Sequence, residues 1–207
     1  MLLKAETWLL ILLVCLNMSL SASRASLVIC GPSGVGKSTL VGAVCKRFQN
    51  KVALCVSHTS RKPRPGEVDG VHYHFSSEEE MKKEIDKNLF LEHAYVHTNI
   101  YGTSRAAVER ILAANKLPIM DVDTRGVQSI KAASGFEAKY VFIAPPSLEA
   151  LYRRLSLRGT ETDADMQVRL NNAEKELEYV HWQMHTLFAL CALPKNTQPC
   201  APPARPP

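Results

Sequence analysis

The middle of the chain alternates short apolar runs with longer segments whose apolar residues recur every three or four positions. Short, partly β-branched runs are typical of buried parallel strands, and the longer segments have the period of amphipathic helices. The expected strands are Ser26–Cys30, Val52–Ser57, Leu117–Asp123 and Lys139–Ala144. This alternation predicts an α/β fold in which a parallel sheet is flanked by helices on both faces.

Five helices are expected between and after these strands. In the second of them, Ser77 is followed by Glu80 at the spacing of a capping box, in which each residue's side chain binds the other's backbone N–H. The expected ranges are about Lys37–Gln49, Ser77–Asn88, Ser104–Asn115, Ser147–Leu157 and Asp163–Tyr179.

Composition narrows the class of protein. The 207 residues suit one domain, with room for a small insertion. Charged residues make up 22% and hydrophobic residues 46%, which excludes global disorder. The net charge of +5 is too small to indicate nucleic-acid binding, but it fits a cleft for anionic phosphates. Cys30, Cys45 and Cys55 lie in apolar runs and are expected to be reduced core residues.

The two ends differ from this body. Residues 1–25 carry Lys4 before an apolar stretch and then small residues, the form of a secretory signal sequence. The alternative is a leader that leaves the body in the cytosol. Residues 194–207 hold six of the 12 prolines, which predicts a disordered tail. The expected boundaries are therefore 1–25 for the leader, 26–193 for the body and 194–207 for the tail.

A phosphate-binding motif follows the first expected strand. Residues 31–38 read GPSGVGKS, which fits the P-loop pattern, and a helix is expected directly after them. Glycines let the backbone N–H groups surround a polyphosphate, Lys37 can bridge its outer phosphates, and the Ser38 hydroxyl can hold Mg²⁺. The residues expected to bind the triphosphate are Gly31, Pro32, Ser33, Gly34, Val35, Gly36, Lys37, Ser38 and Thr39.

A carboxylate is needed beside this loop as a second ligand for the metal. Asp121 lies at the end of an expected strand, and a period of two puts Asp123 on the same side. We therefore expect Ser38 and Asp121 to hold Mg²⁺. The motif alone leaves GTPases, ATPases and small-molecule kinases open.

The segment after the second strand distinguishes these classes. Arg61 and Arg64 lie three residues apart in a proline-stiffened stretch, and two guanidinium groups are suited to binding one phosphate dianion. Tyr73 can add a hydrogen bond. The alternative is a basic surface loop with no ligand.

These motifs together resemble those of guanylate kinase, the ATP:GMP phosphotransferase, over about residues 26–179. The resemblance implies the P-loop kinase fold with a smaller GMP-binding insertion at about residues 57–104 and a helical lid at about 154–169. The matching stretches are Gly31–Leu40, Ser57–Phe75, Phe90–Ser104, Ile119–Lys131, Phe142–Leu148 and Arg153–Leu170.

The resemblance also implies roles for individual residues, with Mg²⁺ as cofactor, ATP as donor and GMP or dGMP as acceptor. The acceptor phosphate is expected at Ser57, Arg61, Arg64, Tyr73 and Tyr101, and the guanine ring at Glu92, Thr103 and Asp123. The expected catalytic residues are Lys37, Arg154, Arg158 and Arg169. We expect a cytosolic monomer, with no nucleic-acid partner and no membrane partner unless residues 1–25 act as an anchor. The alternatives are an impaired isoform and a non-catalytic binding module of the same family.

Two departures from the family pattern stand out. Arg125 replaces a residue that is usually glutamine. After Tyr179 the chain lacks the family's final strand and C-terminal helix. Leu187–Leu193 is apolar and long enough to replace that edge strand, and Pro194 would end it.

Overall fold

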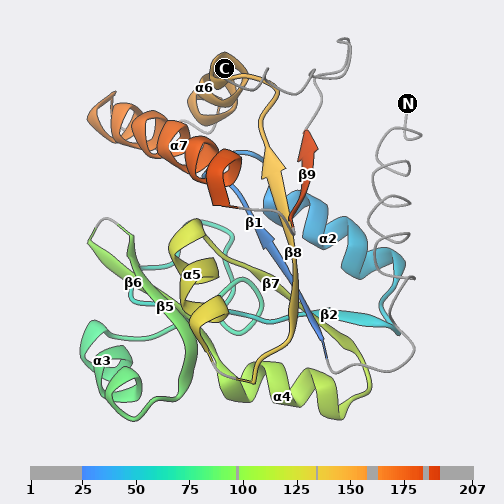
Figure 1. Cartoon of the computed structure of the whole chain (residues 1–207). Coiled ribbons are helices and arrows are strands. Elements are labelled where there is room, and N and C mark those ends of the chain that lie inside the picture. The colour runs from blue at the N-terminus through green and yellow to red at the C-terminus, as the bar shows by residue number, and fades with distance from the viewer. Residues whose placement is uncertain (1–24, 97, 134, 158–162, 184–186, 192–207) are drawn as a thin grey trace.

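A parallel sheet forms the centre of the protein (Figure 1). The computed structural model describes residues 25–96, 98–133, 135–157, 163–183 and 187–191. The sheet has five strands in the order β2-β7-β1-β8-β9, and all four pairings are parallel. The strands are β1 Ser26–Cys30, β2 Val52–Leu54, β7 Leu117–Asp121, β8 Ala138–Ala144 and β9 Leu187–Cys191. The prediction of a parallel α/β fold is confirmed.

Helices cover both faces of this sheet because its central strands are apolar on both sides. Leu27 and Ile29 of β1 pack with helices α2, α6 and α7, whereas Val28 and Cys30 pack with α4 and α5 on the opposite face. Burial of both faces explains why these strands read as continuous apolar runs. The helices are α2 Lys37–Arg47, α4 Arg105–Ala113, α5 Thr124–Ala132, α6 Leu148–Ser156 and α7 Asp163–Gln183.

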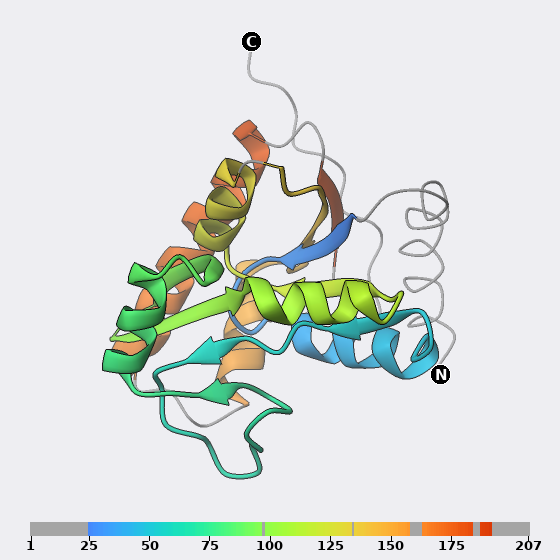
Figure 2. The same ribbon diagram turned by 90° about the horizontal axis from the view of Figure 1, so that it is seen from below.

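A smaller sheet lies beside the main one and forms an insertion in the chain (Figure 2). Its strand order is β4-β3-β6-β5, and Met81 of α3 packs with Phe90 and Ile100 of the sheet. The expected capping box is present, with Ser77 N donating to Glu80 Oε2 at 2.9 Å. The elements are β3 His58–Thr59, β4 His74–Phe75, α3 Glu78–Asp86, β5 Phe90–Val96 and β6 Asn99–Ser104.

The expected strand Leu117–Asp123 extends too far at its carboxyl end, and helix α5, which follows it, was not expected. β7 stops at Asp121, and Asp123 caps α5 by accepting a hydrogen bond from Gly126 N at 2.8 Å. Asp123 therefore belongs to a helix start, and the alternation of a strand does not apply to it. The expected strand Val52–Ser57 is also too long, because β2 pairs with β7 only over Val52–Leu54.

The edge strand expected after Tyr179 is present over Leu187–Cys191. It pairs in parallel with β8, from Tyr140 opposite Leu187 to Ala144 opposite Cys191. The predicted leader, except for Ala25, and the predicted tail lie outside the described residues. In the part of the chain that the structure describes, no helix is long and apolar enough to cross a membrane.

Limited trypsin digestion tests this edge strand. If β9 pairs with β8 in solution, we expect the resistant body to include residues 187–191 and to end at Lys195 or beyond, because sheet hydrogen bonds protect the backbone. Mass spectrometry of the resistant fragment gives its C-terminus. A body that ends at Lys175 and keeps its circular dichroism spectrum would show that the strand is not needed for the fold.

Candidate active site

The loop between β1 and α2 has the geometry of a phosphate-binding loop. Gly31 lies so close to β8 that a Cβ atom there would come within 2.3 Å of the Ile143 carbonyl oxygen. Gly36, directly before α2, has a φ of 106°, in the left-handed region that glycine tolerates best. The glycines of the motif thus meet two different needs, close packing against β8 and a sharp turn into the helix.

Lys37 and Asp121 meet at the base of this loop. Lys37 Nζ donates to Gly31 O at 2.7 Å and to Pro32 O at 3.3 Å, and it lies 3.9 Å from Asp121 Oδ1. Burial raises the pKa of Asp121, and the nearby Lys37 partly opposes that shift. A buried carboxylate of this kind is stabilised by cations, so the base of the loop is suited to a positively charged ligand.

Two arginines far away in the sequence contact the same loop. Arg154 Nη1, on α6, donates to Val35 O at 2.9 Å, and Arg169 Nη1, on α7, donates to Ser33 Oγ at 2.5 Å. Both guanidinium groups therefore lie beside the phosphate-binding loop. Arg158, the third expected lid arginine, lies outside the described residues.

A cavity of about 940 Å³ joins this loop to the insertion. Most of the expected site residues line it, although Pro32, Val35 and Thr39 do not, nor do Thr103 and Arg154. The expected residues in its wall are Gly31, Ser33, Gly34, Gly36, Lys37, Ser38, Ser57, Arg61, Arg64, Tyr73, Glu92, Tyr101, Asp121, Asp123 and Arg169. Residues expected to bind the triphosphate and residues expected to bind GMP thus line the same cavity.

The insertion end of the cavity carries arginines, aromatic rings and hydroxyl groups. The Arg61 guanidinium lies over the ring of Tyr73, with 5.2 Å to the centroid, and Glu67 and, to a smaller degree, Tyr101 raise its pKa. The hydroxyl groups of Ser57 and Thr103 lie 3.2 Å apart. Arg64 is exposed and also lines the cavity. These donors converge as a site for an anion requires.

Glu92 and Asp123 supply acceptors deeper in the cavity. Glu92 is only 5% exposed, and burial raises its pKa to about 7, although a hydrogen bond with Thr103 opposes the shift. The charge of Asp123 adds to the rise. Gly126 leaves room for Glu92, because a Cβ atom there would lie 2.8 Å from Glu92 Oε2. The start of α5 is therefore shaped around this carboxylate.

A sequence model of the guanylate kinase family matches residues 23–187. The chain belongs to the guanylate kinase family. Guanylate kinase 1 of Oryza sativa subsp. japonica is 49% identical over 152 residues, which are 73% of this chain and 40% of that protein. The guanylate kinase of Schizosaccharomyces pombe is 47% identical over 152 residues, 73% of this chain and 75% of that protein.

A solved structure of a guanylate kinase has the same fold. The crystal structure of guanylate kinase from Anaplasma phagocytophilum has a TM-score of 0.60, with 24% sequence identity, and covers 80% of this chain and 76% of that one. The chain spans only about two fifths of the length of the plant relatives from Oryza sativa and Arabidopsis thaliana.

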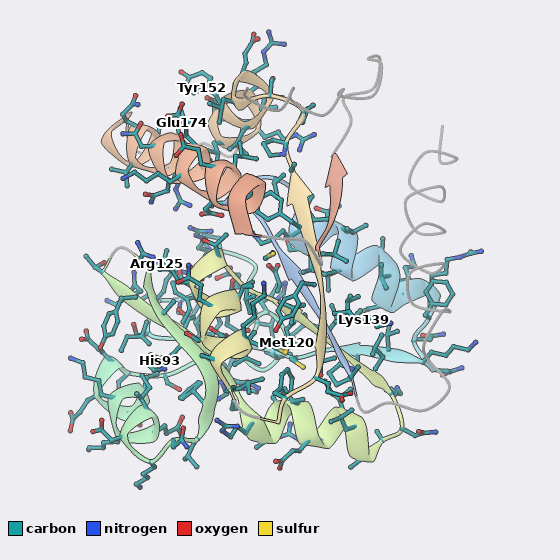
Figure 3. All side chains as sticks on the ribbon, viewed as in Figure 1. His93, Met120, Arg125, Lys139, Tyr152 and Glu174 are labelled. Carbon is teal, nitrogen blue, oxygen red and sulfur yellow. The ribbon has the colours of Figure 1, made fainter. Side chains whose placement is uncertain are left out.

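Within this guanylate kinase fold, Arg125 joins three elements. Its Nη1 donates to the carbonyl of Tyr95 in β5 at 2.8 Å, and Figure 3 places it at the end of α5 nearest to α7. Glu176 of α7 lines the same cavity, and its charge interacts with Arg125. Arg125 therefore ties α5 to the insertion.

Sequence reasoning missed two acidic residues of the cavity, Glu67 and Glu176. Glu67 binds Arg61, and the turn signal Arg-Pro-Gly before it was the available clue. Burial raises the pKa of Glu176 to about 7. Its Oε2 is buried without a hydrogen-bond partner among the described residues. Nothing in the local pattern of α7 marks Glu176 as different from its neighbours Glu174 and Glu178.

Proposed function

We propose that this chain transfers the terminal phosphoryl group of ATP to GMP or dGMP, with GDP or dGDP as the product. The observation that carries the proposal is the single cavity lined by the phosphate-binding loop at one end and by Arg61 and Arg64 at the other. Two anion sites in one cavity fit a reaction between two phosphorylated substrates. The names of the relatives support the same reaction.

In the proposed reaction, the loop and its neighbours bind ATP. The backbone of residues 31–36 and the start of α2 face the triphosphate, and Lys37 moves from the carbonyls of Gly31 and Pro32 to the outer phosphates. Arg154 and Arg169 already contact the loop, so they are placed to offset the charge of the transferred group. Arg158 is assigned to the same lid from the family pattern.

Ser38 and Asp121 fit a Mg²⁺ ion. A hydroxyl and a carboxylate are oxygen ligands of the type that Mg²⁺ prefers, and both line the cavity. The raised pKa of Asp121 indicates a carboxylate that is costly to ionise without a cation. When bound, the ion would supply charge neutralisation for the phosphate oxygens.

The insertion binds GMP. Ser57, Arg61, Arg64, Tyr73 and Tyr101 hold its phosphate. Guanine has N1–H and N2–H donors on one edge, and these suit Glu92 and Asp123, with Thr103 beside them. Adenine has no N1–H and would leave a buried carboxylate without a partner, which costs about 1–3 kcal/mol. The site therefore favours GMP over AMP.

No general base is needed for this reaction. The attacking atom is a phosphate oxygen of GMP, which is already ionised at pH 7. It forms a bond to the γ-phosphorus as the bond from that phosphorus to the leaving oxygen of ADP breaks. The protein's contribution is in-line positioning and charge stabilisation. Because one chain lines both ends of the cavity, we propose a monomer as the working unit and the cytosol, where these nucleotides occur, as its compartment.

A coupled ADP-release assay with the full chain, ATP, Mg²⁺ and either GMP or AMP tests the function. We expect ADP release that depends on GMP, with AMP at least about tenfold less effective because of the unpaired carboxylate. ADP release that is independent of GMP, or equal with AMP, would contradict the proposal. Tight GMP binding without turnover would identify the impaired isoform instead.

A further inference from the structure

A tight turn directs Glu67 back towards Arg61. In the sequence Arg64-Pro65-Gly66-Glu67, the N–H of Glu67 donates to Arg64 O at 3.0 Å. Gly66 has a φ of 82°, and proline followed by a glycine of positive φ is the pattern of a type II turn. A Cβ atom on Gly66 would meet nothing within 4 Å, so the glycine is there for its backbone conformation.

The carboxylate of Glu67 binds both arginines of the insertion. Its Oε2 accepts hydrogen bonds from Arg61 Nη1 and from the backbone N–H of Arg64, each at 2.7 Å, and its Oε1 accepts from Arg61 Nη2 at 2.9 Å. These bonds hold the pKa of Glu67 down at about 2, so its charge persists at neutral pH. One side chain thus holds the guanidinium of Arg61 and the backbone of Arg64.

This pairing leaves one edge of the Arg61 guanidinium that Glu67 does not occupy. Both Nη1–H groups are used, one by Glu67 and one by the Lys62 carbonyl at 2.8 Å, and Nη2 gives one hydrogen to Glu67. The Nε–H and the second Nη2–H form the side edge of the group, which can bind two oxygens at once. Tyr73 and Phe75 lie under the guanidinium, with 5.2 and 5.7 Å to their centroids, and they restrict its plane.

We propose that Glu67 is a positioning residue of the acceptor site: it holds one edge of Arg61 so that the side edge receives the phosphate of the acceptor. The inference rests on the proposed function and deepens it. A carboxylate that competed with the phosphate would occupy the side edge. Glu67 occupies the other edge and is itself anchored by the N–H of Arg64, so it can stay in place when the phosphate binds.

The test compares GMP with guanosine, which has the same base and ribose but no phosphate. In calorimetric titrations of the full chain, we expect Glu67→Gln to weaken GMP binding about tenfold, the scale of ordering one long side chain on binding. Guanosine affinity and the KM for ATP should stay within about twofold of wild type, because Glu67 acts only through the phosphate. Glu67→Asp keeps the charge but is shorter, so it should lose less affinity than Glu67→Gln.

Glu149→Gln is the matched control, because Glu149 also pairs with an arginine, Arg153, but on an exposed helix face outside the cavity. It should change neither ligand's affinity, and thermal unfolding verifies that each variant is folded. Two results for Glu67→Gln would overturn the inference: equal losses of affinity for GMP and guanosine, or GMP binding that is unchanged or tighter. In either case, GMP-dependent turnover by the wild-type chain would still support the proposed function. A wild-type chain that binds no GMP would instead overturn the proposed function, and the inference with it.

Discussion

Replacing Lys37 with alanine is expected to lower kcat for ADP formation by about 10²–10³, the usual effect of removing one charge-stabilising donor. The ammonium lies at the base of the loop, within hydrogen-bonding distance of two of its carbonyls and 3.9 Å from Asp121. No other described lysine has these contacts with the loop. The measurement is the coupled assay at saturating ATP and GMP.

Lys46→Ala is the control for this prediction. Lys46 is exposed in the last turn of the same helix, α2, and it does not line the cavity. We expect its turnover to match that of wild type. GMP affinity should stay within about twofold in both variants, because the acceptor end of the cavity is intact. A Lys37→Ala variant that retains half of the wild-type kcat would rule out the proposed role of the loop.

The second large effect is expected for Glu92→Gln, which should both weaken GMP binding and stabilise the folded protein. In the proposed GMP complex the ionised carboxylate accepts hydrogen bonds from guanine, and loss of a charged acceptor costs about 1.5–3 kcal/mol, or about 10–100-fold in Kd. The same ionised group is costly in the free protein because it is only 5% exposed. Calorimetry with GMP checks the first effect, and denaturant unfolding between pH 4 and pH 8 checks the second.

The pH dependence of stability has a definite sign. The pKa of Glu92 rises from 4.5 in the unfolded chain to about 7 in the fold, so the folded state binds the proton more tightly. The stabilisation that the fold gains from this tighter proton binding is fully present below pH 4.5 and is lost as pH rises through about 7. Glu92→Gln should therefore match wild type at pH 4 and exceed it by up to about 3 kcal/mol at pH 8.

A matched variant isolates Glu92 from the other raised carboxylates. Glu176 also has a pKa of about 7, so wild type will lose stability over the same range for a second reason. The difference between Glu92→Gln and wild type removes that shared part. Glu109→Gln, on the exposed side of α4, should show no such difference. An equal gain for Glu92→Gln at pH 4 and pH 8 would show that ionisation of Glu92 does not limit stability.

Local signals predicted the donor half of the site. The run from Ser26 to Ser38 specifies a buried strand, a glycine loop and a helix start within 13 consecutive residues, and the structure has each of them. The capping box at Ser77 and the edge strand at Leu187–Cys191 were likewise readable. Neighbouring residues carry these signals because backbone conformation and burial of one face are decided over a few positions.

The carboxylate end of the proposed acceptor site depended on contacts that no local pattern contains. α5 was missed because its start depends on one bond, from Gly126 N to Asp123, and its glycine makes room for Glu92 from another strand. From the sequence, Asp123 was predicted to be the last residue of a strand. Only the fold showed it as a helix cap at the wall of the cavity.

By itself, the sequence determined the parallel α/β class, the phosphate-binding loop and the arginine pair, because each arises from adjacent residues and the chemistry of their side chains. Tertiary structure alone decided which partners these residues have. Glu67 pairs with Arg61, Arg154 and Arg169 donate hydrogen bonds to the loop, and Arg125 donates to a carbonyl of β5. The physical reason is distance along the chain. Arg169 and Ser33 are 136 positions apart, and their contact depends on the packing of the whole sheet and its helices.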